Sequence, residues 1–254
     1  MLKAFWFLSS NFGDALNHYI LSRLSRDGVA YIDVSDRDKK VVAIGSILNW
    51  CNENCIAWGP GLANRQDQVN PQAEIRAVRG PLSRQRALEC GASVPEVYGD
   101  PALLLPLLYR PPSRKKFSLG IIPHYIDQAA VMHRYKAESK EIRIIDVLDT
   151  PERVIDEIVS CDRIVSSSLH GIIVAHAYHI PAAWLKFGEK IGGDDMKYVD
   201  YFLSVDCAIN VPIACHDLPS PREILARAEH HFEQEFLINT SPLLGCCPFE
   251  LVDL

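Results

Sequence analysis

The sequence predicts an α/β protein built as two halves with parallel strands. Three observations indicate this. Short β-branched and apolar runs alternate with segments of helical period along the chain. A proline-rich, basic stretch at residues 109–116 interrupts the alternation, which then starts again. Residues 163–186 have the pattern of a buried strand, a serine-rich turn, an apolar helix and a second strand.

The predicted boundary between the halves lies at the basic stretch, which is typical of a linker. We therefore expect an N-terminal half over residues 1–110 and a C-terminal half over residues 111–254. The final helix of the second half is expected to cross back and brace the first half. Such an arrangement would place a ligand site between the two sheets.

In the N-terminal half, strands are predicted where short apolar runs meet turn residues, and helices where apolar residues recur every three or four positions. The predicted strands cover residues 4–8, 41–44, 57–62 and 74–79. The predicted helices are residues 15–26, with Asp14 as a candidate N-cap, and the segment that Pro81 opens and Gly91 ends. Asp100 is expected to cap a turn in the Gly-Asp-Pro segment.

The C-terminal half repeats the alternation. Its predicted strands are residues 118–122, 142–148 and 182–186, and a strand that opens at residues 163–165 and ends in the serine run 166–168. Its predicted helices are one that starts at Pro151, one that follows the serine run, and residues 197–203 and 221–236. Residues 188–195 are rich in glycine and acidic side chains and predict a loop.

Composition limits the classes of function. The 254-residue chain has a net charge of −6, which argues against a nucleic-acid partner. No apolar run has the length of a membrane span, and the apolar start is too short for a signal peptide. We therefore expect a cytoplasmic protein, either free or at the inner face of the membrane.

The eight cysteines have no spacing typical of a zinc site. They are expected to be reduced thiols, as is usual in the cytoplasm. The sequence predicts no metal site and no cofactor.

The first candidate site residue is His170. It follows a predicted buried strand and opens an apolar helix, so it lies at the carboxyl end of the sheet, where open α/β folds bind ligands. The neighbours that could bind an anion through hydroxyl or backbone N–H groups are Ser167, Ser168, Leu169 and Gly171. A lone histidine is more often structural than catalytic, its position makes the two roles about equally compatible with the sequence, and these neighbours favour function.

Further candidate ligand contacts lie at the ends of other predicted strands. Asn11, Gly13 and Asp14 occupy the first strand-to-helix turn. His124 follows the first strand of the second half and is expected to face the same site. For Asp14, capping and ligand binding are equally compatible with the sequence.

Two cations are also candidates. Arg79 lies just before a predicted helix N-terminus, where a guanidinium can form forked hydrogen bonds to a phosphate or carboxylate. Lys186 ends the strand that follows the His170 helix. It is either a further cation for a ligand or a structural lysine.

Taken together, these segments resemble the polysaccharide pyruvyl transferase family. The matching segments are Asn11-Phe12-Gly13-Asp14, Ala77-Val78-Arg79-Gly80-Pro81, Gly99-Asp100-Pro101-Ala102, Gly120-Ile121-Ile122-Pro123-His124 and Ser167-Ser168-Leu169-His170-Gly171. They occur in the family's order over about residues 4–205, and the start is similar to members that act on bacterial exopolysaccharides such as succinoglycan. Some members have an arginine where this chain has Ser168, so its anion contacts are expected to differ.

The resemblance implies two Rossmann-like halves, as in two-domain (GT-B-like) glycosyltransferases, with the site between them. It implies phosphoenolpyruvate as the donor, a sugar of a polysaccharide or its lipid-linked precursor as the acceptor, and a cyclic pyruvate ketal as the product. His170 is then expected to be the general acid that protonates the donor. The residues expected at the donor are Arg79, Ser167, Ser168, Leu169, Gly171, Lys186 and His124, and those at the acceptor are Asn11, Gly13 and Asp14.

Two other functions are compatible with the same architecture. One is a nucleotide-sugar-dependent glycosyltransferase, and the other is a saccharide-binding module without catalysis. Fold does not separate them, because function depends on the site.

Overall fold

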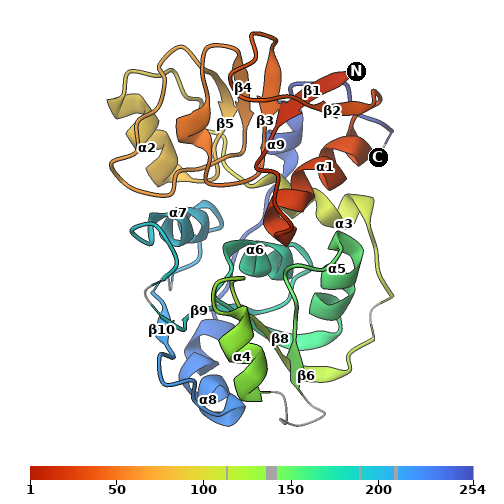
Figure 1. Cartoon of the computed structure of the whole chain (residues 1–254), viewed down its shortest axis with the longest axis vertical. Coiled ribbons are helices and arrows are strands. Elements are labelled where there is room, and N and C mark those ends of the chain that lie inside the picture. Colours follow the sequence, from red (N-terminus) through yellow and green to blue (C-terminus); the bar gives the residue numbers. More distant parts are fainter. Residues whose placement is uncertain (113, 136–141, 189, 209–210, 254) are drawn as a thin grey trace.

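The computed structural model describes residues 1–112, 114–135, 142–188, 190–208 and 211–253. Two parallel five-stranded sheets, each flanked by helices, lie one above the other (Figure 1). The predicted α/β class with two Rossmann-like halves is confirmed.

The first sheet has the strand order β2-β1-β3-β4-β5, and every pairing is parallel. Its strands are β1 (Leu2–Phe5), β2 (Val29–Tyr31), β3 (Lys40–Val42), β4 (Cys55–Trp58) and β5 (Glu74–Ala77). The helices of this half are α1 (Phe12–Leu24), η1 (Leu48–Trp50), α2 (Pro81–Glu89), η2 (Pro101–Leu104) and α3 (Leu105–Leu108).

The second sheet has the order β10-β9-β8-β6-β7, again with parallel pairings. Its strands are β6 (Phe117–Ile122), β7 (Ile142–Ile144), β8 (Cys161–Ser166), β9 (Ala182–Lys186) and β10 (Ile213–Ala214). The helices that follow in the chain are α4 (Gln128–Tyr135), α5 (Pro151–Val159), α6 (Leu169–Ala177), α7 (Met196–Ser204), α8 (Pro221–Phe232) and α9 (Ser241–Gly245).

Both halves share one topology. When the strands of each half are numbered in chain order, both sheets have the order 2-1-3-4-5. In this doubly wound order the connections reverse direction between the first and third strands, and ligands bind at the carboxyl ends of those two strands. The switch points of this protein are therefore β1/β3 in the first half and β6/β8 in the second.

The boundaries of several elements differ from those predicted. Helix α1 begins at Phe12, three residues earlier than expected, so Asn11 is its N-cap residue and Asp14 lies in its first turn. The N-cap prediction for Asp14 is therefore wrong. Strands β2 and β10 were not predicted because three- and two-residue strands show no alternation long enough to detect.

The end of the chain returns to the first half. Helix α8 packs against β9 in the second half, whereas α9 lies beside elements of the first (Figure 1). The indole N–H of Trp58 donates to the Leu243 carbonyl at 2.8 Å, and Ser25 forms an antiparallel bridge with Leu251. The return is thus made by the segment after α8.

The two halves also share one apolar core. Helix α1 packs against α5, and Leu16 and Ile20 belong to the same buried cluster as Ile155 and Ile158. These side chains are inaccessible to solvent. Burial of this surface favours a fixed arrangement of the halves over independent domains.

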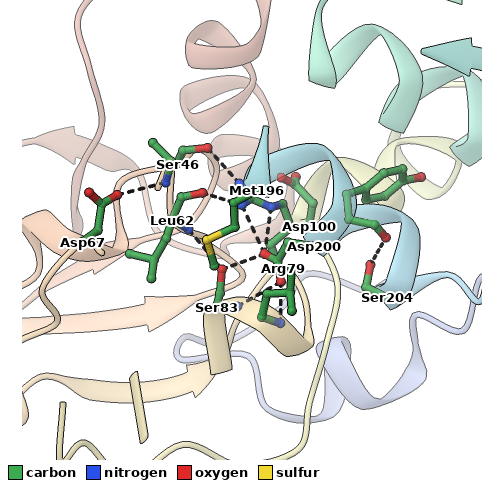
Figure 2. Close-up of polar contacts among 12 residues, drawn as sticks. Ser46, Leu62, Asp67, Arg79, Ser83, Asp100, Met196, Asp200 and Ser204 are labelled. Atoms are coloured by element: carbon green, nitrogen blue, oxygen red, sulfur yellow. Dashed lines mark hydrogen bonds and ion pairs between the residues drawn. The ribbon is translucent and has the colours of Figure 1, made fainter. Parts of the chain in front are cut away.

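A buried ion pair is a second contact between the two halves. Asp200 on α7 is fully buried and lies 3.1 Å from the Arg79 guanidinium, which is 1% exposed (Figure 2). Its carboxylate also accepts hydrogen bonds from the N–H groups of Leu82 and Ser83 and from the Ser83 hydroxyl. The carboxylate therefore binds both a cation and the N-terminus of α2, where negative charge is favoured.

Within the part of the chain that the structure describes, no helix combines the length and apolar character that crossing a bilayer requires.

We expect Asp200→Ala to lower the free energy of unfolding by about 3–5 kcal/mol, because it leaves the Arg79 guanidinium buried without its counter-ion. Urea denaturation measures the change. Asp162→Ala, at an exposed position on β8, is the control and should change stability by no more than about 0.5 kcal/mol. Equal effects of the two substitutions would contradict the structural role of the pair.

Candidate functional site

The switch point of the second half is built from the ends of β6 and β8. The Ser167 hydroxyl accepts a hydrogen bond from the His124 N–H at 2.8 Å, and the Ser167 N–H donates to the Ile122 carbonyl. The Tyr198 hydroxyl of α7 donates to the Ser167 carbonyl. These bonds hold the two strand-to-helix turns together, so the predicted site residues Ser167 and His124 are neighbours.

His170 lies in the first turn of α6 and faces the first half. A Cβ placed on Gly13 would lie 2.2 Å from His170 Nδ1, closer than two non-bonded atoms can approach. Only glycine allows this contact between α1 and the imidazole. The first turn of α1 and the start of α6 lie side by side (Figure 1).

Asp100 lies on the other side of the imidazole. Its Oδ2 is 3.5 Å from His170 Nε2, a ring nitrogen that is buried and makes no hydrogen bond within the described residues. Its Oδ1 accepts from the Ala102 N–H at 2.9 Å, which confirms the predicted turn cap. One buried carboxylate thus caps η2 and lies beside the histidine, and the sequence revealed only the first of these contacts.

The other residues around the serine turn determine the backbone conformation at the start of α6. Ser168 is the N-cap residue of α6 but forms no side-chain cap bond, and its N–H donates to the Ser166 hydroxyl. A Cβ on Gly171 would lie 2.5 Å from that hydroxyl, so a small residue is required there. Leu169 is buried in the shared core. These contacts fix the first turn of α6 beneath His170.

Arg79, predicted to contact the donor, has its guanidinium inside the protein. Besides Asp200, its Nη1 donates to the Ser46 hydroxyl at 2.8 Å and its Nη2 to the Leu62 carbonyl at 2.7 Å. Gly61 permits this position, since a Cβ there would lie 2.3 Å from the guanidinium carbon. The side chain holds the first half to α7.

Lys186 is also paired: its Nζ lies 3.0 Å from Asp195 Oδ2. A cation that the sequence did not single out lies nearby, at the start of α7. Burial lowers the pKa of Lys197 to about 8, and the positive charge of Arg79 acts in the same direction. Burial, and to a smaller extent the charge of Lys197, lowers the pKa of His124 to about 4. The charge of Lys197 is therefore felt by a residue at the end of β6, and Lys197 itself feels the charge of Arg79 in the first half.

Further polar atoms lie after β6. Asp127 Oδ2 and Gln128 Oε1 are buried without a hydrogen-bond partner in the described residues, and burial raises the pKa of Asp127. The sequence did not distinguish Asp127 and Gln128 from ordinary residues at the start of a helix. The described residues contain no group of three or more histidine, cysteine or acidic side chains placed to hold a metal ion.

Asn11 and Asp14 lie on a pocket of about 340 Å³ whose other lining residues are Phe7, Ser9, Ser10, Tyr125 and Leu148. The pocket has walls from both halves, because residues 7–14 connect β1 to α1 whereas Tyr125 and Leu148 follow β6 and β7. Gly13 joins this pocket to His170 along the chain. The predicted acceptor residues and the predicted proton donor are therefore adjacent.

Comparison with known proteins relates this site to a family. The chain is 31% identical over 199 residues to an uncharacterised protein, L143, of Acanthamoeba polyphaga mimivirus, covering 75% of this chain and 69% of that protein. It is 27% identical over 199 residues to the succinoglycan biosynthesis protein ExoV of Rhizobium meliloti, covering 75% of this chain and 60% of ExoV. No solved structure matches.

A family model for polysaccharide pyruvyl transferases matches residues 11–186. The match includes the first turn of α1, Arg79, Asp100, the β6/β8 switch point and His170, which are the parts that the structure brings together. The chain belongs to the polysaccharide pyruvyl transferase family.

Proposed function

We propose that this protein transfers the enolpyruvyl group of phosphoenolpyruvate to a hexose of an exopolysaccharide, or of its lipid-linked precursor, and closes a cyclic pyruvate ketal. Family membership supports the transfer of pyruvyl groups to a polysaccharide. The name of ExoV, a succinoglycan biosynthesis protein, supports an exopolysaccharide as the acceptor. The donor is proposed from the chemistry of the site.

The observation that carries the proposal is the convergence of three separate motifs on one imidazole. Gly13 lies against Nδ1 of His170, Asp100 lies beside Nε2, and the serine turn supplies the backbone beneath the ring. A histidine oriented by a carboxylate is a common arrangement for general acid–base catalysis, because the carboxylate fixes the orientation of the ring. We assign proton transfer to the His170 imidazole.

The reaction needs one proton donor and two hydroxyl nucleophiles. His170 gives a proton to the methylene carbon of phosphoenolpyruvate, and the neighbouring carbon becomes electrophilic. A sugar hydroxyl forms a bond to that carbon, and its proton returns to the His170 imidazole. The bond from this carbon to the phosphate oxygen then breaks and phosphate leaves. The second sugar hydroxyl adds to the same carbon, and its proton passes to the released phosphate.

The donor carries a phosphate and a carboxylate, so it requires positive charge. We assign direct contact to Lys197, supported by the N-terminus of α6 and by the Ser167–Ser168 turn. Arg79 and Lys186 already bind Asp200 and Asp195. Arg79 therefore contributes to the position of α7 on this side of the site, and the His124 N–H contributes a hydrogen bond to Ser167 that holds the turn after β6.

His170→Ala is expected to lower kcat by about 10²- to 10⁴-fold, the usual contribution of a general acid. The substitution removes the proton donor and leaves the Lys197 side unchanged. Phosphate release from phosphoenolpyruvate in the presence of a saccharide acceptor, together with the mass gain of the acceptor, measures the loss.

His133→Ala is the matched control, because this histidine is exposed on α4 in the second half. It should retain full activity. Undiminished turnover of the His170→Ala enzyme would refute the catalytic assignment, and release of a nucleoside diphosphate from nucleotide sugars would refute the proposed donor.

Lys197→Ala is expected to raise the KM for phosphoenolpyruvate by about 10- to 100-fold, since it removes a charged hydrogen-bond donor. The wild-type protein should also bind the donor more weakly as the pH rises above about 8, because the Lys197 ammonium of the ligand-free protein then loses its proton. In Lys197→Arg this decline should disappear, because a guanidinium stays charged.

Lys116→Ala, at an exposed position before β6, should leave donor binding unchanged. Calorimetric titration with phosphoenolpyruvate between pH 7 and 9 tests both expectations. Equal pH profiles for the wild type and Lys197→Arg would exclude Lys197 from the donor site.

A further inference from the structure

The pocket between the two halves combines exposed aromatic rings with a polar wall. Phe7 and Tyr125, both on its lining, are 38% and 50% exposed, and Leu148 is 46% exposed. Large apolar side chains gathered at one exposed depression mark a binding surface more often than scattered ones do. The volume of about 340 Å³ is at the small end of the range of ligand pockets.

Both rings are held in place by neighbouring side chains. The Phe7 ring meets Trp50 edge-on at 5.1 Å and the buried Phe5 edge-on at 5.9 Å. The Tyr125 ring packs on His124 at 4.3 Å between centroids. Rings fixed before a ligand arrives lose little side-chain entropy when it binds.

The polar wall retains free hydrogen-bonding capacity. Ser9 donates to Asp14 Oδ2 at 2.6 Å, and the Asn11 amide donates to the same oxygen at 3.4 Å. Within the described residues, no hydrogen bond reaches the other carboxylate oxygen of Asp14. Ser10, on the same rim, is exposed. A ligand that presents hydroxyl groups on its edge can use these atoms.

We propose that this pocket is a pyranose subsite, in which an apolar C–H face of one acceptor sugar packs on Tyr125 or Phe7 while its hydroxyls bind Asp14 and Asn11. A pyranose has this combination of apolar faces and hydroxylated edges, whereas phosphoenolpyruvate is small and anionic and has no such face. The inference rests on the proposed function, to which it adds how the acceptor is recognised. The subsite exists only when the halves are docked, because its two rings come from different halves.

Position relative to His170 supports this occupant. Asp14 follows Gly13, which packs against the imidazole, so the residue proposed to bind the sugar is one position along α1 from the contact with the proposed proton donor. Lys197 is on α7 and lies on the side of the β6/β8 switch point. The subsite therefore accounts for the acceptor and leaves the cationic side for the donor.

Saturation-transfer difference NMR on the intact protein with phosphoenolpyruvate, and with lactose or cellobiose as probes, tests the subsite. We expect saturation to concentrate on the C–H protons of one sugar ring, and to be lost in the double variant Phe7→Ala/Tyr125→Ala. Tyr125→Phe should keep the signal. Tyr31→Ala, an aromatic residue 37% exposed that does not line the pocket, should also keep it.

Kinetics separate this inference from the proposed function. Tyr125→Ala should raise the KM for the saccharide acceptor by about tenfold, with the KM for phosphoenolpyruvate unchanged. Sugar binding at these rings without pyruvyl transfer would support the subsite and refute the proposed reaction. Pyruvyl transfer with an unchanged acceptor KM in the double variant, or no NMR signal from either sugar, would overturn the subsite.

Discussion

The relative position of the two halves depends on the interactions of the buried Asp200 carboxylate. This carboxylate neutralises Arg79, binds the N-terminus of α2, and comes from a helix that the second half supplies. Charges removed from water require partners, so the pair is stable only when α7 lies against the first half. With the shared apolar core on α1 and α5, it fixes the relative position of the two sheets. Every candidate group at the interface depends on that position.

The absence of a side chain at Gly13 is a second requirement of this arrangement. Gly13 lets α1 approach the imidazole of His170, and Asp100 supports the ring from the opposite side. Two segments that lie far from His170 in the sequence therefore meet at its imidazole. The identical strand order of the two halves explains this meeting, since each half presents its strand-to-helix turns at the carboxyl edge of its sheet.

The interface divides into two chemically different sides. Lys197, whose pKa is affected by Arg79, lies on the side toward α7, whereas Phe7, Tyr125 and Asp14 line a pocket on the other side. The proposed anionic donor and the proposed neutral sugar need such different environments. Under the proposed function, His170, which contacts Gly13, serves the reacting atoms of both substrates.

The sequence alone determined the alternation of strands and helices, the two halves and the position of His170 at a strand end, because these features follow from local periodicity and from neighbours along the chain. The tertiary structure decided which side chains meet. Arg79 pairs with a residue 121 positions away, and local patterns do not encode such a partner. The same limit concealed Lys197 and the second contact of Asp100. Their roles come from long-range packing, which depends on the docking of two sheets.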